Sequence, residues 1–313
     1  MTASQLQGEE GQGSQDLRRV AVVFNPATGE DPGGRRSELK AALAATGQEV
    51  LWLETTRQDP GGGLARKAVA DGADLVMVAG GDGTVMACVT ALAGTDVPLA
   101  VLPGGTGNLL ANNLEIPREL DGALEVALRG DRRRLDVGAV GDDRFVIMCG
   151  IGFDAAMLRD ADSKLKARIG AVAYVLSGAR QIRRRPTTFR LHLDERPPMT
   201  RRGQGVLVGN LGRLQGGLPV MPDASPSDGQ LDVAVLKTRT VLDWLALAVR
   251  VLARRRQREP QMELSRARRV EVHCDRPQPV ERDGEPGEPT TELVVEVVPS
   301  ALTLCVPPRE EQP

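Results

Sequence analysis

Three glycine-rich segments in the first half of the chain carry residue types that bind phosphate. They are Asn25-Pro26-Ala27-Thr28-Gly29, Gly80-Gly81-Asp82-Gly83-Thr84 and Pro103-Gly104-Gly105-Thr106-Gly107-Asn108. Glycine lacks a Cβ and tolerates positive φ, so main-chain N–H groups in such loops can point at phosphate oxygens. One Gly-Gly turn is weak evidence of a site. Three of them, each after an apolar run, favour a single anion-binding crevice.

Asp82 is the one acid in these segments. A carboxylate between phosphate-binding glycines would repel the ligand unless a hard cation bridges the two. The sequence therefore predicts that Mg²⁺ accompanies the phosphates.

Residues required by other phosphate-binding and metal-binding motifs are missing from the sequence. The chain has no Gly-Lys dipeptide, so a Walker P-loop is absent, and Leu110 stands where a Rossmann fingerprint needs its third glycine. With only two histidines, His-Glu-x-x-His zinc sites and phosphotransfer between paired histidines are excluded. A P-loop ATPase and an NAD-dependent dehydrogenase are thus both disfavoured.

The elements that must position the glycine segments alternate between strand and helix. Strands are predicted at 20–24, 49–53, 75–79 and 99–102, and helices at 38–46, 64–70, 85–92 and 109–114. This alternation with short links is typical of a parallel sheet covered by helices on both faces. All three segments then lie at the carboxyl edge of the sheet, where ligands bind.

After about Leu135 the pattern changes to short alternating strands. They are predicted at 145–148, 188–193, 205–208, 231–236, 270–273 and 292–298, with amphipathic helices at 164–182 and 241–257. A mostly antiparallel β-domain is expected here. Residues 1–17, rich in Gly, Gln, Glu and Ser, predict a disordered tail.

Asp283 and Glu285 flank Gly284 in a stretch, 278–289, that is full of proline, glycine and charge. Two interpretations stay open from the residues alone. An exposed charged hairpin is the favoured one. The other is a carboxylate that accepts the proton of an alcohol during phosphoryl transfer.

The ordered set of motifs resembles the diacylglycerol kinase catalytic-domain family, which includes bacterial diacylglycerol kinases, YegS-like lipid kinases and sphingosine kinases. Beyond the three glycine segments, the similarity extends through Gly150–Ala155, Pro222-x-Ala224 with Asp228-Gly229-x-Leu231, and Asp283-Gly284-Glu285. It covers about residues 19–307. The Gly-Gly-Asp-Gly core alone is shared with NAD kinases and 6-phosphofructokinases, whereas the set of six is specific.

The resemblance implies two domains. An α/β nucleotide-binding domain with a parallel sheet, similar to NAD kinase and diacylglycerol kinase, would span 18–135, with 301–313 returning to it. A mostly antiparallel β-sandwich domain that binds the lipid substrate would span 136–300.

The resemblance also implies site residues. The ATP site would comprise Asn25, Pro26, Ala27, Thr28, Gly29, Thr55 or Thr56, Gly80, Gly81, Asp82, Gly83, Thr84, Thr106 and Asn108. Glu285, aided by Asp283, would be the proton acceptor, and Asp82 would act beside the phosphates. A structural Mg²⁺, away from the transferred phosphate, would be held by Asp228 with the main-chain carbonyls of Ser225 and Gln230. The chain departs from the family pattern at two positions. It has Leu109 where the family often has an acid, and Ser225 where some members have lysine.

The expected function is therefore ATP- and Mg²⁺-dependent transfer of the γ-phosphate to a lipid hydroxyl, diacylglycerol-like or sphingoid. Two alternatives stay open. One is a soluble-substrate kinase of NAD-kinase type, which would lack the Asp-Gly-x-Leu segment and the late Asp-Gly-Glu. The other is a non-catalytic member that binds a nucleotide or a membrane. No short motif encodes which lipid is used.

Charge and cysteine usage predict where the chain acts. The net charge of the chain is −2. However, the stretch from Arg159 to Arg202 contains 12 basic and 4 acidic residues, and the stretch from Arg250 to Arg269 contains 8 basic and 2 acidic residues. These are either solvated faces or a surface for an anionic membrane. Without a continuous basic tract, nucleic acid is not an expected partner. Four dispersed cysteines, no secretory segment and no bilayer-length apolar run fit a cytoplasmic, peripherally membrane-associated protein, with a homodimer left open.

Overall fold

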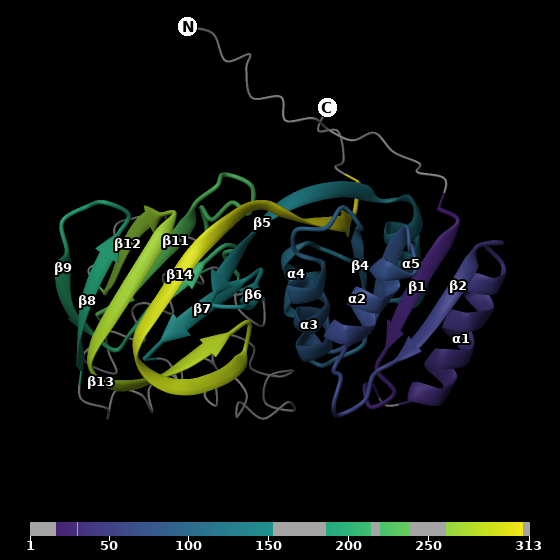
Figure 1. Ribbon diagram of the computed structural model, residues 1–313, viewed down its shortest axis with the longest axis horizontal. Coiled ribbons are helices and arrows are strands. Elements are labelled where there is room, and N and C mark those ends of the chain that lie inside the picture. Colours follow the sequence, from purple (N-terminus) through teal and green to yellow (C-terminus); the bar gives the residue numbers. More distant parts are fainter. Residues whose placement is uncertain (1–16, 30, 153–185, 214–219, 238–260, 309–313) are drawn as a thin grey trace, which may run out of the picture. The chain divides into compact units, whose positions relative to one another are not determined.

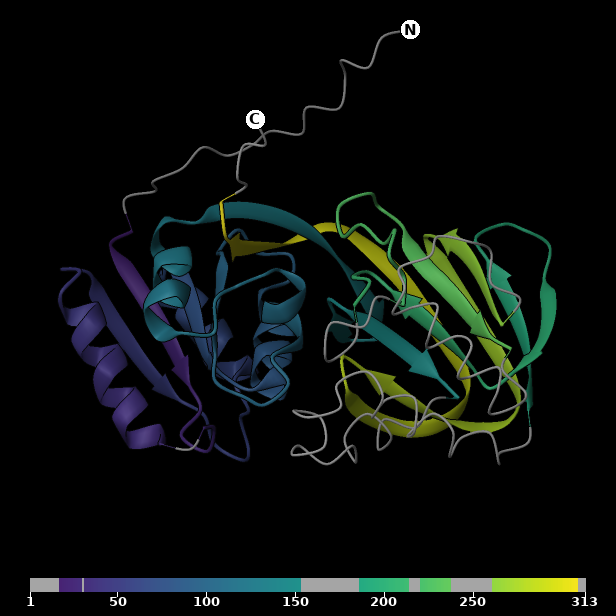
Figure 2. The same ribbon diagram turned by 180° about the vertical axis from the view of Figure 1, so that it is seen from behind.

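The computed structural model describes residues 17–29, 31–152, 186–213, 220–237 and 261–308. The chain divides into two compact units. The described residues up to Leu135, with those from Ala301 onward, form the first, and Asp136–Ser300 form the second. Strands β5 (Asp131–Val140) and β14 (Glu285–Val306) contribute to both (Figures 1 and 2).

The first unit contains the predicted parallel sheet. Its strands, in the spatial order β2-β1-β3-β4, are β2 (Glu49–Glu54), β1 (Arg19–Phe24), β3 (Leu75–Gly80) and β4 (Leu99–Pro103). All neighbours pair in parallel, and the end of β14 joins β4 through Leu304 and Leu99. Strands β3 and β4 are buried throughout, as expected for parallel strands covered on both faces.

Five helices accompany these strands in the described part of the first unit (Figure 1). They are α1 (Pro32–Ala44), α2 (Gly62–Ala70), α3 (Asp82–Leu92), α4 (Leu109–Asn113) and α5 (Leu120–Arg129). Helix α1 begins at Pro32, not at Glu38 as the sequence predicted. The Asp31 carboxylate caps it by accepting the Gly34 N–H at 2.9 Å, and Pro32 suits a first helical position. Asp31 and Pro32 thus stabilise the start of the helix, although Gly33 and Gly34 are poor helix formers and make the segment resemble a loop in the sequence.

The second unit is the predicted antiparallel β-sandwich. Its strands are β6 (Asp143–Phe145), β7 (Met148–Ile151), β8 (Thr187–Leu193), β9 (Met199–Gly203), β10 (Gly205–Gly209), β11 (Leu231–Leu236), β12 (Met262–Ala267) and β13 (Arg269–Arg282), with most of β5 and β14. The described strand pairs β5–β6, β7–β10, β7–β13, β8–β9, β8–β13, β10–β11, β11–β12 and β13–β14 are all antiparallel. One core cluster combines Leu207, Met221, Leu236 and Met262.

Two sequence predictions for this unit were wrong in extent. A single strand was expected at 145–148, but β6 ends at Phe145 and β7 starts at Met148. The long strands β13 and β14 also run through 278–289, which was expected to be a loop. Proline is tolerated in β13 because the pairing with β14 shifts register on both sides of Gln278, next to Pro277 and Pro279.

Some predictions lie outside the described residues. These are the tail up to residue 16, the helices expected at 164–182 and 241–257, and the end of the Gly150–Ala155 motif. The arginine clusters at 183–185 and 254–256 lie there too.

Candidate functional site

The three glycine segments lie together at the carboxyl ends of β1, β3 and β4. Phe24 pairs with Ala79, and Gly80 pairs with Pro103, so the three strands end side by side. The Gly104 N–H donates to the Gly80 carbonyl at 3.2 Å. A Cβ built on Gly105 would stand only 2.8 Å from the Cα of Gly81. Glycine is therefore required there by close backbone approach.

Asn25 fastens the first segment to the second. Its side-chain Nδ2 donates to Thr84 Oγ1 at 2.9 Å, and its backbone N–H donates to the Ala79 carbonyl at 2.9 Å. The same side chain accepts the Ala27 N–H through Oδ1. Gly29 closes the segment at φ +95°, a conformation that L side chains rarely adopt. One amide side chain thus fixes the shape of the first loop and its position beside helix α3.

Asp82 fastens the second segment to the third. It is the first residue of α3, and its Oδ1 accepts the N–H of Leu109, where α4 begins, at 2.7 Å. The N-terminus of the eleven-residue helix α3 carries partial positive charge, which favours anions nearby. Asp82 therefore joins two loops and places a carboxylate beside an otherwise anion-favouring helix end.

The third segment is shaped by Asn108, which has the left-handed φ of +47°. Its Oδ1 accepts the Gly105 N–H at 3.0 Å, and its Nδ2 donates to the Gly105 carbonyl at 2.7 Å. Thr106, at the tip, is exposed. Thr55 is buried just after β2 and donates its backbone N–H to the Phe24 carbonyl at 2.9 Å. Thr55 is thus adjacent to the strand that leads into the first loop.

Arg35, which sequence reasoning missed, lies beside these loops. From α1 its guanidinium donates to the carbonyls of Leu102 and Pro103, and its Cζ lies 3.7 Å from where a Cβ of Gly104 would stand. Burial lowers the pKa of Arg35 from its ordinary value, yet an arginine keeps its charge at neutral pH. The sequence feature that could have indicated Arg35 is the pair Arg35-Arg36, which follows Gly33 and Gly34. Because these glycines are typical of a loop, no helix was predicted there.

In the second unit, the Asp-Gly-Glu motif forms a two-residue hairpin turn between β13 and β14. Arg282 pairs with Glu285, while Asp283 and Gly284 occupy the turn at φ +45° and +87°. Positive φ at both central residues is what a type I′ turn needs, and Asp-Gly suits it. The hairpin interpretation is therefore correct for the backbone of this motif.

The two acids of the motif have different surroundings. Asp283 is only 2% exposed, and its carboxylate accepts the N–H groups of Val146, Ile147 and Met148 at 2.9, 3.0 and 2.7 Å. Glu285 is exposed. Asp283 thus anchors the turn, and Glu285 is the carboxylate of the motif that is exposed to solvent. The same three bonds explain why the chain is not a strand at 146–147.

The predicted metal segment lies in the turn before β11. Asp228 accepts the Gln230 N–H at 3.0 Å, and its other oxygen is 3.7 Å from the Arg266 guanidinium. Arg266 also bonds to Asp232 at 3.1 Å. The turn is held by buried Asp136, which accepts the Gly229 N–H at 2.7 Å and which sequence reasoning missed. Within the described ranges, no three His, Cys, Asp or Glu side chains gather as a metal cluster.

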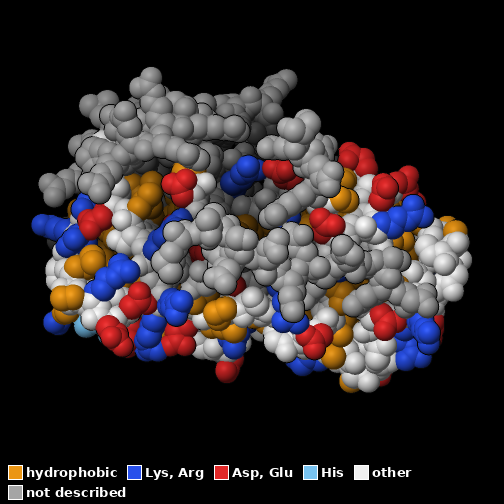
Figure 3. All heavy atoms as spheres, turned by 90° about the horizontal axis from the view of Figure 1, so that it is seen from above, with side chains coloured by type: hydrophobic (Ala, Val, Ile, Leu, Met, Phe, Trp, Pro, Cys, Tyr) orange, Lys and Arg blue, Asp and Glu red, His pale blue; other side chains and the backbone are white. Residues whose placement is uncertain are grey.

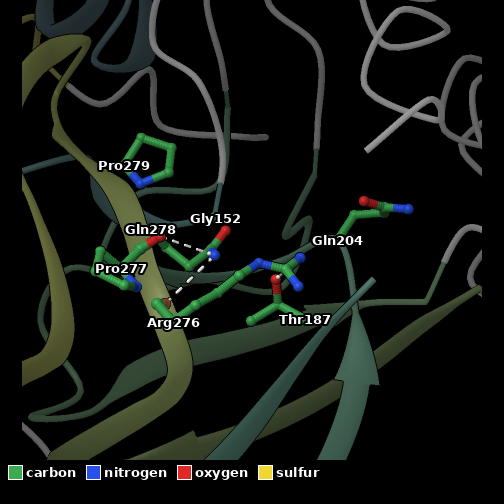
Figure 4. A pocket seen from close by; sticks show the side chains of 7 residues that line it. All are labelled: Gly152, Thr187, Gln204, Arg276, Pro277, Gln278 and Pro279. Atoms are coloured by element: carbon green, nitrogen blue, oxygen red, sulfur yellow. Dashed lines mark hydrogen bonds between the residues drawn. The ribbon is translucent and has the colours of Figure 1, made fainter. Parts of the chain in front are cut away.

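A cavity of about 420 Å³ opens in the second unit beside β8, β10 and β13 (Figure 4). Its lining includes Thr187, Gln204, Arg276 and Gln278. The Arg276 guanidinium donates to Thr187 Oγ1 at 2.9 Å, and the Gln278 amide donates to the Pro277 carbonyl at 3.0 Å. These groups give a lining of mixed polar and apolar character, which also includes Pro277 and Pro279. None of the helices that the structure describes is long and apolar enough to cross a membrane.

Comparison with known proteins bears on both units. The diacylglycerol kinase catalytic domain matches residues 19–140, and the YegS C-terminal NAD kinase beta sandwich-like domain matches residues 147–306. A Mycobacterium tuberculosis protein named diacylglycerol kinase is 29% identical over 282 residues, which cover 88% of this chain and 89% of that protein.

Two further relatives agree. A Chromohalobacter salexigens protein named "Probable lipid kinase YegS-like" is 31% identical over 294 residues, which cover 91% of this chain and 92% of the relative. The crystal structure of a diacylglycerol kinase from Bacillus anthracis matches with a TM-score of 0.72 at 22% identity, over 94% of this chain and 98% of that one, which supports the fold. Because two family domains match in order along nearly all of its length, this chain belongs to the diacylglycerol kinase catalytic-domain family of kinases, in the form with a YegS-type C-terminal β-sandwich.

Proposed function

We propose that this chain transfers the γ-phosphate of ATP to a hydroxyl group of a lipid such as diacylglycerol. The observation that carries the proposal is the joining of three glycine loops at one sheet edge by Asn25 and Asp82. Such a cradle offers main-chain N–H groups, hydroxyls and a helix N-terminus to a polyphosphate. Family membership supports ATP as its ligand.

The acceptor side of the reaction rests on Glu285. As the lipid oxygen forms its bond to the γ-phosphorus, the bond from that phosphorus to the ADP oxygen breaks. The hydroxyl proton passes to the Glu285 carboxylate. Exposure of Glu285 on a turn that Asp283 fixes supports this role, because a base must be both accessible and held in place.

Mg²⁺ is part of the proposal at two places. Asp82 is an oxygen donor beside the phosphate cradle, and a bound Mg²⁺ would supply neutralisation of phosphate charge there. Asp228, with a side chain 28% exposed, fits a second, structural ion together with the carbonyls of Ser225 and Gln230, since all three offer the oxygen ligands that Mg²⁺ prefers. Arg266 lies 3.7 Å from one Asp228 oxygen, so an ion bound through that oxygen would have to displace a guanidinium contact.

An anionic membrane surface is the proposed partner. On the face shown in Figure 3, acidic and basic side chains of the described residues are interspersed. The proposal therefore depends on the sequence clusters Arg183–Arg185 and Arg254–Arg256, each worth about 1 kcal/mol per arginine near an anionic surface. Co-sedimentation with anionic and neutral vesicles tests it. Equal binding to both, or binding unchanged by high salt, would contradict it.

Product analysis tests the reaction itself. The purified chain is incubated with ATP labelled at the γ-position and Mg²⁺, in parallel with diacylglycerol in mixed micelles, a total membrane lipid extract, and NAD. We expect label in a lipid phosphate, and the extract identifies which lipid. Label in NAD instead would assign a soluble-substrate kinase, and ATP binding without any labelled product would assign a non-catalytic member.

A further inference from the structure

Glu281 is a buried acid that the proposed reaction does not use. It lies on β13 with 1% exposure, opposite Gly150 of β7. A Cβ on Gly150 would stand 3.4 Å from Glu281 Oε1 and 2.8 Å from a methyl carbon of Leu207. The glycine therefore makes room mainly for Leu207, and Glu281 lies next to it at contact distance. Burying a carboxyl group is costly, so its contacts call for a reason.

The contact that Glu281 makes is to the turn carrying Glu285. Its Oε2 accepts the N–H of Gly284 at 3.2 Å. On the other side of the same turn, the Asp283 carboxylate accepts the N–H groups of residues 146–148. Two buried carboxyl groups, one at each side, thus hold the two-residue turn, and Glu285 follows it directly.

The charges around Glu281 favour its neutral form. Burial, and to a smaller extent the nearby Asp283 carboxylate, raise the pKa of Glu281 to about 8, while the bond from the Gly284 N–H acts in the opposite direction. Of the other titratable neighbours, the Cys149 thiol is buried with a raised pKa, and the Arg282 guanidinium pairs with Asp143 at 2.9 Å. Glu285 is exposed to solvent. The interior therefore holds one negative charge, on Asp283, while Glu281 beside it stays neutral.

We propose that Glu281 is a positioning residue for Glu285: as a neutral acid it accepts the Gly284 N–H and fixes the turn that presents the base. The proposal rests on the proposed role of Glu285. A neutral acceptor of the same length, glutamine, should replace it, whereas alanine should not. Ionisation of Glu281 would place two carboxylates side by side in the interior and loosen the turn.

Steady-state kinetics of Glu281→Ala and Glu281→Gln test the positioning role, with exposed Glu288→Gln as the matched control. At pH 7 we expect Glu281→Ala to lower kcat about tenfold or more with the KM for ATP unchanged, because small misplacement of a reacting group is costly. Glu281→Gln and Glu288→Gln should stay within about twofold of wild type. Above about pH 8 the wild type should lose activity that Glu281→Gln keeps. Equal pH profiles for these two proteins would overturn the proposal.

Two substrate-free measurements separate this proposal from the proposed function. Amide hydrogen exchange at Gly284 should be faster in Glu281→Ala and unchanged in Glu281→Gln at pH 7. Because folding raises the pKa of Glu281, the native state keeps a proton that the unfolded chain loses, so stability falls as pH rises from about 4.5 to about 8. That slope should be smaller in Glu281→Gln than in wild type. Unchanged exchange in Glu281→Ala, or an equal slope in both proteins, would overturn the positioning role even if wild type phosphorylates no lipid.

Discussion

The candidate functional residues of the first unit and those of the second are held in place in different ways. In the first unit, the phosphate cradle consists of backbone from three neighbouring strand ends, and glycines allow the close approach of Gly81 and Gly105. In the second unit, the turn before Glu285 is held by buried carboxyl groups, and Asp283 bonds to N–H groups more than a hundred positions away along the chain. The cradle depends on the absence of side chains, and the turn depends on their presence.

This difference predicts different sensitivities. Added volume should damage the cradle, because a Cβ has no space there. Loss of an acceptor should damage the turn, because buried N–H groups would be left without partners. Changes of charge that keep the backbone hydrogen bonds, as at Glu285 and Asp82, should affect the chemistry while leaving the fold in place.

The largest effect is expected at Glu285. Glu285→Gln keeps the shape of the side chain but removes the proton acceptor, so kcat should fall by about 10²–10⁴-fold. ATP affinity, measured by calorimetry, should stay at the wild-type value. A matching loss of ATP binding would instead place Glu285 in the nucleotide site.

Asp82→Asn is the corresponding change in the cradle. Asparagine can still accept the Leu109 N–H through its oxygen, so the joined loops should survive while the charge beside the phosphates is lost. We expect a loss of about 10²–10³-fold in turnover with the melting temperature nearly unchanged. Near-normal turnover at saturating Mg²⁺ would show that Asp82 serves only to join the loops.

Asp283→Asn probes the anchor of the turn. Asparagine has one acceptor oxygen where the carboxylate uses two for three N–H groups, so the free energy of unfolding should fall by about 3 kcal/mol. Chemical denaturation measures this, with Glu288→Gln on the exposed part of β14 as control. A loss of turnover at full stability would give Asp283 a direct part in the chemistry.

Gly105→Ala tests the volume limit of the cradle. The new methyl group would stand 2.8 Å from the Cα of Gly81, so the loops must separate, and ATP affinity should fall about tenfold. Gly33→Ala in α1 is the control, since its Cβ meets nothing closer than 3.7 Å. If both variants bind ATP equally, the closeness of the loops has no part in binding.

The smallest effect is expected at Asp228. When Mg²⁺ is at ten times its Kd, a structural ion adds about 1.4 kcal/mol to stability, and Asp228→Ala should remove that increment. Thermal unfolding with Mg²⁺ and with a chelator measures it, while turnover should change little. A Mg²⁺-induced shift that persists in the variant would place the ion elsewhere.

Much of the first unit follows from local patterns. Four predicted strands agree with β1 to β4 within about a residue at each end, because fully buried parallel strands are continuous apolar runs bounded by turn residues. Their parallel order then brings the three glycine segments together. Helix α5 and strand β5 were not predicted, and α1 began earlier than expected because its capping residues preceded two glycines.

The second unit was harder to predict because its decisive contacts are long-range. Nothing in residues 145–148 by themselves indicates that their N–H groups bond to Asp283, and that bonding divides β6 from β7. Similarly, 278–289 has the composition of a loop, yet register shifts allow β13 and β14 to continue through it. The short strands β9 and β12 were missed as well.

The sequence by itself determined the two-part architecture, the glycine cradle and the identity of its polar residues, because each depends on residue type and on spacing along the chain. Only the tertiary structure decided what each acid does. Asp283, Glu281 and Asp136 are ordinary charged residues in the sequence, but burial next to backbone N–H groups from other elements makes them acceptors that hold turns. Burial and partners belong to the folded chain, so the distinction between an anchoring acid and a reactive one appears only there.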